Sequence, residues 1–209
     1  ALQVGFYRRF AAPWRAVAAA VGRGAIGTPV LATVAFFDRS LPIPSFADPA
    51  VSGGLLVDNG IHELDALRWL LGPIADASMM PGPDPEGSLT AAGDLAVASV
   101  TLRFASGAIA TLGLTRGLAG ADGTRLEIVG TSGAIRIETA PRARAILTVA
   151  GVEHEIPGSA AQDYWREAIA EELRALARGD ADVPGAADSA AAVETAVRLR
   201  ESITIERKP

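Results

Sequence analysis

The residues best suited to chemistry lie in one stretch of the sequence, residues 52–71, which reads SGGLLVDNGIHELDALRWLL. Asp58, His62 and Asp65 follow one another at i, i+4 and i+7, so in a helix their side chains share one face. A carboxylate one helical turn from an imidazole can fix its tautomer and raise its basicity, which suits a general acid or base. The spacing therefore predicts a site for proton transfer.

The same spacing is compatible with two other interpretations. Asp-x3-His-x2-Asp contains residue types that bind metals, but it is not one of the tight ligand motifs, and the sequence shows no second cluster of ligands. The three side chains could also form a polar helix face that is only solvated or hydrogen-bonded. Spacing alone leaves these alternatives open, and we expect no metal here.

The residues around the trio must hold it in place. An apolar face beside the polar one would pack the helix on a core, and it comprises Val57, Ile61, Leu64, Leu67 and Leu71. Gly53 and Gly54 would let the backbone approach another group closely, and Ser52 could cap the helix. Gly60, inside the helix, costs about 1 kcal/mol relative to alanine unless something packs tightly against it.

The other elements are predicted from hydrophobic periodicity. Strands are expected at 2–7, 29–38, 74–80, 94–104, 108–116, 126–130, 134–138, 146–150 and 152–156, and further helices at 13–23, 161–177 and from Asp188 onward. Consecutive hairpins with short turns indicate a largely antiparallel sheet. We therefore predict an α+β (α/β) fold, with a large, mainly antiparallel mixed sheet that carries helices on one face.

Periodicity also predicts which side chains face inward. In helix 161–177 the residues expected to face the core are Trp165, Ile169, Leu173 and Leu176. His154 shares a strand face with Val152 and Ile156, so we expect it to be half-buried and hydrogen-bonded rather than part of a site. Phe46, in the Pro-rich loop before the central helix, is a candidate wall for a substrate.

Composition narrows the functional class. The 209 residues are 49% hydrophobic and 21% charged, as in ordinary globular domains. The net charge of −5 disfavours binding to nucleic acid or to an anionic membrane, because phosphates would be repelled. The lack of cysteine excludes disulfides and thiolate metal sites, and no apolar run reaches the roughly 18 residues of a membrane-spanning helix. We expect a soluble, cytoplasmic protein.

The order of residues around His62 resembles a known motif. Gly-Gly-x3-Asp-x-Gly-x-His-x2-Asp, followed by Arg68 and Trp69, is similar to the motif of the Gfo/Idh/MocA oxidoreductases, the family of glucose-fructose oxidoreductase and inositol dehydrogenase. GFYRRF at residues 5–10 resembles the join between that family's two domains, and the resemblance continues through 104–108 and 129–134. It covers essentially the whole chain.

This resemblance implies roles for the site residues. The counterpart of His62 exchanges the proton of a sugar or cyclitol hydroxyl, and the counterpart of Asp58 helps to hold substrate and imidazole. Tyr7, Arg8 and Arg9 would lie near the carboxyl end of the strand expected at 2–7, where open α/β sheets bind ligands, although they could equally be surface residues that cap a strand. Tyr7, Arg9 and Asp65 are therefore the candidate substrate-binding residues, and Asp65 also suits a structural role. The implied fold is that of the carboxyl-terminal domain of glyceraldehyde-3-phosphate dehydrogenase. We expect a homodimer or homotetramer through the open sheet face, where alternation would leave a broad apolar patch.

Members of this family also begin with a dinucleotide-binding domain, which carries a Gly-rich phosphate loop after its first strand and a lysine that supports proton transfer. We expect no G-x-G-x-x-G phosphate loop in this chain, and the single lysine is Lys208. Residues 1–28 are therefore interpreted as a strand and helix from the far edge of such a domain, and residues 29–209 as a substrate-binding and oligomerisation domain. NAD or NADP would bind to the absent amino-terminal domain, with no cofactor-binding residue in this chain.

Two functions follow as hypotheses. The first is the substrate-side domain of an NAD(P)-dependent oxidoreductase that acts on a secondary alcohol of a sugar, cyclitol or related polyol and is inactive alone. The alternative is a stand-alone binding or assembly module that has lost cofactor chemistry. The isolated strand expected at 2–7 favours the first, because its edge would otherwise have no partner strands.

Overall fold

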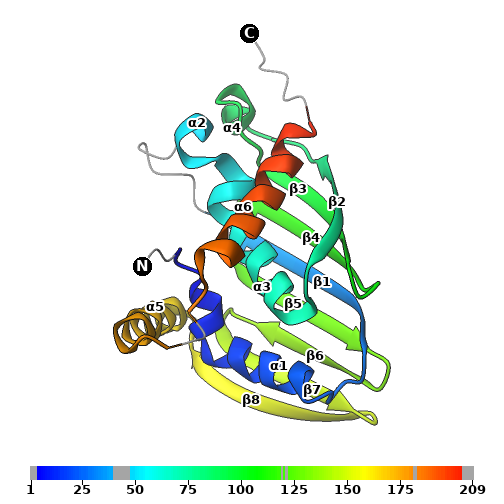
Figure 1. The fold of residues 1–209 in the computed structure, drawn as a ribbon. Helices are drawn as coiled ribbons and strands as arrows, with labels where there is room; N and C mark the ends of the chain where they lie inside the picture. The colour runs from blue at the N-terminus through cyan, green and yellow to red at the C-terminus, as the bar shows by residue number, and fades with distance from the viewer. Residues whose placement is uncertain (1–3, 40–47, 119, 121, 181–182, 204–209) are drawn as a thin grey trace.

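The computed structural model describes residues 4–39, 48–118, 120, 122–180 and 183–203. One eight-stranded sheet, in the order β2-β3-β4-β1-β5-β6-β7-β8, runs through the molecule with helices on one face (Figure 1). The strands are β1 Pro29–Asp38, β2 Ile74–Pro81, β3 Val97–Phe104, β4 Ile109–Arg116, β5 Gly123–Gly130, β6 Gly133–Glu138, β7 Arg142–Val149 and β8 Val152–Ala160. Among the described strands, only β1 and β4 pair in parallel, so the predicted mixed, mainly antiparallel sheet is confirmed.

Strict alternation of buried and exposed side chains forms the core. On β3, Ala98, Val100 and Leu102 are buried, while the residues between them are exposed. The same period on β4 and β5 continues the apolar layer under the helices. Each of these strands therefore buries one of its two faces.

The helical layer has two parts. The helices are α1 Ala12–Gly22, α2 Pro49–Ser52, α3 Ile61–Leu71, α4 Ser88–Ala91, α5 Ala161–Arg178 and α6 Ala186–Glu201, together with the 3₁₀-helix η1 Tyr7–Phe10 and the π-helix η3 Leu55–Gly60. Helix α1 lies over β6 to β8, and α3 with α6 lies over the half of the sheet that contains β1 to β4 (Figure 1). None of the described helices is both long and apolar enough to cross a membrane.

The strand expected at 2–7 is wrong for its described part. Residues 4–6 have no regular structure, and Tyr7 begins the 3₁₀-helix η1. The apolar Phe6 packs against Ile61 of α3 and Ala192 of α6 instead of joining a sheet. The apolar pattern that had indicated a strand therefore reflects the burial of Phe6 between two helices.

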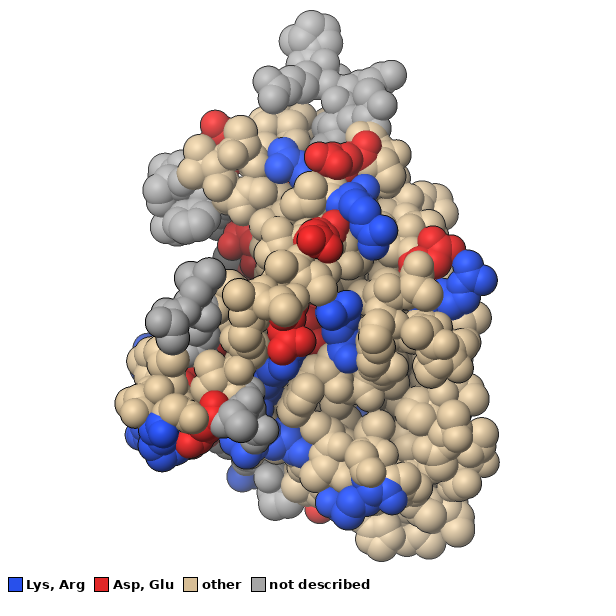
Figure 2. Space-filling model, viewed as in Figure 1, with Lys and Arg blue, Asp and Glu red and all other residues tan. Residues whose placement is uncertain are grey.

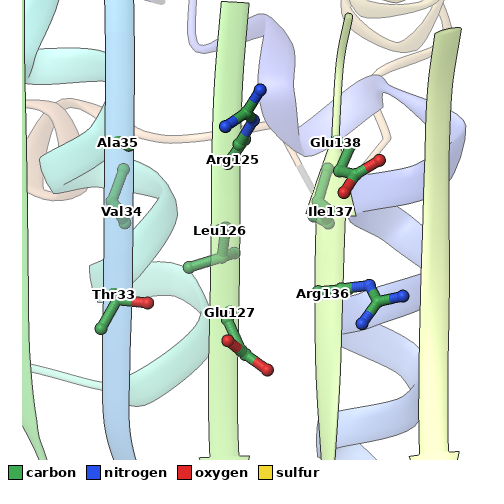
Figure 3. Close-up of a pocket in the computed structure, with 9 residues that line it drawn as sticks. All are labelled: Thr33, Val34, Ala35, Arg125, Leu126, Glu127, Arg136, Ile137 and Glu138. Atoms are coloured by element: carbon green, nitrogen blue, oxygen red, sulfur yellow. The ribbon is translucent and has the colours of Figure 1, made fainter.

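The open face of the sheet is less apolar than expected. Its exposed side chains include Thr33, Thr101 and Thr111, and the ion pairs Arg136 with Glu153 and Arg144 with Glu138 lie on the other half. A hollow of about 240 Å³ on this face is lined by arginine and glutamate from β5 and β6, as Figure 3 shows. Its large apolar side chains include a row of register partners, Ile109, Leu31 and Val129, and Met80 opposite Ser99. The open face therefore combines apolar side chains on one half with charged pairs on the other, so the predicted apolar patch covers only part of it.

Charges on the helical face are also mixed in sign. Figure 2 shows acidic and basic side chains next to one another there, with no large patch of a single sign. Such a surface offers no extended positive field to a nucleic acid.

The predicted inner face of α5 is reversed. Tyr164, Ala168 and Ala175 are buried, whereas the four apolar residues expected inward are exposed: Trp165, Ile169, Leu173 and Leu176. Helix α5 packs along the edge of the sheet against η1 and β8, where the small alanines allow close approach. The predicted burial of His154 is also wrong, because this residue is exposed on β8.

The reversed face of α5 can be tested with two leucine substitutions. Leu173→Ala should change the free energy of unfolding by less than about 0.5 kcal/mol, because Leu173 is 61% exposed. Leu199→Ala on α6 is the matched control, and it should cost about 2–5 kcal/mol because Leu199 is 2% exposed. Urea unfolding would measure both, and equal losses would mean that α5 buries its larger side chains.

Candidate active site

The segment that carries the predicted trio is not one continuous helix. Helix α2 ends at Ser52, and Gly53 (φ 83°) and Gly54 (φ 67°) turn the chain before η3 begins. Ser52 is therefore not the cap of α3, and its hydroxyl accepts the N–H of Gly54 at 3.1 Å. Because a π-helix bonds i to i+5, the step from Asp58 in η3 to His62 in α3 differs from one α-helical turn.

The glycines of this segment make room for the protein itself. A Cβ on Gly54 would lie 2.2 Å from Oδ1 of Asp94, and one on Gly60 would lie 3.0 Å from Cδ1 of Leu114. The close packing that Gly60 requires is thus confirmed. The close approach expected at Gly54 is to a carboxylate of this chain, and that carboxylate would repel a phosphate.

Asp58 is paired with an arginine from the sheet. Its Oδ2 forms an ion pair with Nη2 of Arg116 at the end of β4, and Nη1 of Arg116 lies 3.4 Å from Oδ2 of Asp94. The side chains of Arg116 and Asp94 are 3% and 6% exposed, whereas that of Asp58 is 33% exposed. Asp58 is therefore the accessible end of a buried charge chain.

His62 lies against aromatic rings. Tyr7 and Phe6 contact it edge-on, with ring centroids 5.2 and 6.2 Å away. The side chain keeps some accessible surface, but its Nδ1 is buried and has no hydrogen-bond partner among the described residues. Burial, and then the positive charge of Arg8, lowers the pKa of His62 to about 3.

The expected rise in the basicity of His62 is therefore wrong. That expectation assumed a carboxylate beside the imidazole, but Asp58 is engaged by Arg116 and the adjacent Glu63 by Arg8. The imidazole is consequently neutral at pH 7, in the form that can accept a proton.

A buried network beneath His62 was missed by sequence reasoning. Arg8 forms an ion pair with Oε1 of Glu63, donates to Oγ1 of Thr124 at 3.1 Å and donates to the hydroxyl of Tyr7 at 2.6 Å. Arg8 and Glu63 are both buried. The sequence offered one indication of this network, because Arg8 and Glu63 are neighbours of the predicted Tyr7, Arg9 and His62. Adjacency in sequence, however, does not reveal that two charged side chains are buried together.

Arg9 and Asp65 satisfy each other. Arg9 donates from Nε to Oδ2 of Asp65 at 2.9 Å and from Nη2 to Oδ1 at 2.6 Å. Asp65 has no accessible surface, and burial raises its pKa although Arg9 acts in the opposite direction. This geometry ties η1 to α3 and does not support the predicted substrate contacts of these two residues.

The trio does not converge on one point. Asp58 pairs with Arg116, Asp65 with Arg9, and His62 packs on aromatic rings. Within the part of the chain that the structure describes, no group of three histidine, aspartate or glutamate side chains could hold a metal ion.

A hollow of about 560 Å³ adjoins the site, and Tyr7 is a shared wall. Arg8, Thr124 and Tyr164 also line it. Such a volume and polar lining suit a small polar ligand. Phe46, which was predicted as a wall for a substrate, lies outside the described residues.

One hexapeptide, GRGAIG at residues 22–27, fits the G-x-G-x-x-G spacing of a dinucleotide loop. It follows helix α1 and leads into strand β1, which is the reverse of the strand, loop and helix order that binds a pyrophosphate. A Cβ on Gly27 would lie 2.2 Å from Oγ1 of Thr131, so this turn packs against the β5–β6 hairpin. This hexapeptide therefore does not form a loop that could hold a pyrophosphate.

Comparison with known proteins gives a consistent result. The model of the GFO/IDH/MocA C-terminal domain matches residues 14–136. Inositol 2-dehydrogenase of Rhizobium meliloti (strain 1021) is 30% identical over 99% of this chain and 64% of its own length. Myo-inositol 2-dehydrogenase of Thermotoga maritima is 30% identical over 70% of this chain and 44% of its own length.

Solved structures agree with the fold. A putative myo-inositol dehydrogenase from Sinorhizobium meliloti 1021 superimposes with a TM-score of 0.78 and 28% identity, over 98% of this chain and 65% of that one. Scyllo-inositol dehydrogenase from Lactobacillus casei, solved with NAD(H) and scyllo-inositol, gives a TM-score of 0.73 and 27% identity over 96% and 62%. The chain thus spans less than two thirds of the length of each of these four relatives.

The buried pair of Arg9 and Asp65 predicts an unequal effect of two similar substitutions. Asp65→Asn should lower the free energy of unfolding by about 1–3 kcal/mol, because Arg9 then loses the charged acceptor of two hydrogen bonds, and Asp188, 3.9 Å from its Nη1, replaces that acceptor only in part. Asp76→Asn, which breaks the exposed pair with Arg103, is the matched control and should cost about 0–1 kcal/mol. Urea unfolding of both variants is the measurement, and a small loss for Asp65→Asn would show that the pair is dispensable.

The low pKa of His62 predicts a loss of stability in mild acid. Between about pH 6.5 and pH 3 the unfolded chain binds a proton at this imidazole and the folded chain does not, so the free energy of unfolding falls as pH falls. From pH 6.5 to pH 5 the loss due to His62 is up to about 2 kcal/mol, and His62→Gln should abolish that part.

Proton NMR gives a direct check of the same pKa. The His62 imidazole signal should keep its neutral position down to about pH 4, and His154→Gln identifies the signal because it removes the other histidine. A midpoint near pH 6.5 for His62 would contradict this assignment of its surroundings.

Proposed function

Because the chain belongs to the GFO/IDH/MocA family, we propose that it is the substrate side of an NAD(P)-dependent oxidoreductase. Its substrate would be a secondary alcohol of a cyclitol, sugar or related polyol. The relatives named as inositol dehydrogenases support this substrate class. Residues 29–209 would form the substrate-binding and oligomerisation domain, onto which η1 and α1 pack.

The observation that carries the proposal is that α3 begins with a neutral, partly accessible imidazole, His62, while the preceding η3 presents the accessible carboxylate of Asp58. Oxidation of a secondary alcohol requires a base at the hydroxyl as hydride leaves the carbon. Since Nδ1 of His62 is buried, Nε2 would accept the hydroxyl proton. Asp58 would orient the substrate by accepting a hydrogen bond from one of its hydroxyls.

The cofactor would be held elsewhere. The described residues supply no pyrophosphate loop, so NAD or NADP, which takes the hydride in such reactions, would bind to a dinucleotide-binding domain outside these residues. The chain alone would then be unable to turn over.

We also propose a homodimer or homotetramer through the open sheet face. Sheet faces with small side chains, such as Thr101, Thr111 and Gly113, can approach closely. The aliphatic row of Ile109, Leu31 and Val129 would be covered, and the alternating charges of β5 and β6 could pair across a two-fold axis.

A chimera tests the proposed activity. The chain would be joined to the dinucleotide-binding domain of the Rhizobium meliloti inositol 2-dehydrogenase and assayed for NADH formation with myo-inositol and scyllo-inositol. We expect turnover by the chimera and none by the 209 residues alone. His62→Ala should lower kcat by about 10²–10⁴-fold, because general base catalysis contributes that much.

His154→Ala is the matched control, and it should leave kcat unchanged because His154 is exposed on β8. Equal losses for the two histidines would show that His62 is not the base. A chimera that folds and binds NADH but oxidises neither inositol nor other polyols would contradict the proposed function.

A further inference from the structure

Three charged side chains from three elements form a continuous chain that ends at the proposed site. Asp94 precedes β3, Arg116 ends β4, and Asp58 lies in η3. The two nitrogens of one guanidinium divide between the two carboxylates, Nη1 toward Asp94 and Nη2 toward Asp58. Positions 58, 94 and 116 are far apart in sequence, so only the fold brings them together.

Asp94 is a fixed anchor. Its Oδ1 accepts the backbone N–H of Leu55 at 2.9 Å and of Leu95 at 2.8 Å. The carboxylate reaches Leu55, the first residue of η3, only because Gly54 has no Cβ. Asp94 therefore holds both the start of the π-helix and the arginine that contacts Asp58.

Arg116 has little freedom to move. Its side chain is 3% exposed, and its backbone N–H donates to the carbonyl of Ala96 at 2.8 Å. Its Nε is buried and has no hydrogen-bond partner within the described part of the chain. A buried N–H without a partner is unfavourable, so the fold holds this guanidinium in place despite an energetic cost. A rigid arginine fixes the orientation of the carboxylate that it binds.

Asp58 keeps one oxygen open. Oδ2 is taken by Arg116, and Oδ1 has no hydrogen-bond partner among the residues that the structure describes. We propose that Asp94 and Arg116 are positioning residues, which hold Asp58 so that its open oxygen accepts a hydrogen bond from a substrate hydroxyl. This inference rests on the proposed function, in which Asp58 contacts the polyol.

The inference is tested by a double-mutant cycle read out as ligand binding. Binding of myo-inositol and scyllo-inositol to the 209-residue chain and to the chimera would be measured by calorimetry, which needs no turnover. Arg116→Gln and Asp58→Asn should each weaken binding by about 10-fold or more, as loss of a hydrogen bond to a charged group does. In the Asp58→Asn background, Arg116→Gln should change binding by less than about two-fold, because Arg116 acts through Asp58.

Controls separate positioning from loss of structure. Arg103→Gln, which breaks an exposed pair on the neighbouring strand β3, should leave binding unchanged. Arg116→Lys keeps a charge for Asp58 but cannot bridge two carboxylates, so it should restore binding in part. It also serves as the test variant if Arg116→Gln does not fold.

Two results would overturn the inference. One is an equal loss from the Arg116 substitution in the wild-type and Asp58→Asn backgrounds, which would indicate a structural effect. The other is no binding of either inositol by the wild-type chain or chimera, which would leave Asp58 without a ligand. Binding with the expected cycle but no turnover would support the inference and count against the proposed function alone.

Discussion

The structure of the site depends on the buried ion pair between Arg8 of η1 and Glu63 of α3. A buried pair contributes little net stability, because desolvation offsets much of the attraction, but removal of either partner is costly. The pair therefore acts chiefly to specify position. Together with Arg9 and Asp65, it fixes η1 against α3 on both sides of His62.

The same pair sets the chemistry of the imidazole. Glu63 is the carboxylate next to His62 in sequence, but its Oε1 is engaged by Arg8, which adds a positive charge near the ring. Packing against Tyr7 and Phe6 removes water as well. Both effects favour the neutral imidazole. One interaction thus positions the helix and determines the protonation state of its histidine.

The predictable part of this fold was the part governed by local periodicity. Strand β1 was predicted at its observed bounds, and α1 to within one residue, because alternation and helical spacing reflect burial directly. Helix α5 carries two apolar stripes, and periodicity cannot decide whether the stripe of Leu173 or that of Ala168 faces the core. The π-helix η3 was also beyond sequence reasoning, because its register depends on Asp94, a residue distant in the sequence.

The function of each site residue follows from the hydrogen-bonding capacity that the fold leaves unused. Both carboxylate oxygens of Asp65 accept hydrogen bonds from Arg9, and the residue is buried. Asp65 therefore has a structural role although it matches the family motif. Asp58 has the same side chain, but Arg116 takes one oxygen only, and the carboxylate remains accessible. Spacing in the sequence treats the two aspartates alike. Their partners, which come from η1 in one case and from β4 in the other, distinguish a carboxylate that holds the protein together from one that can hold a substrate.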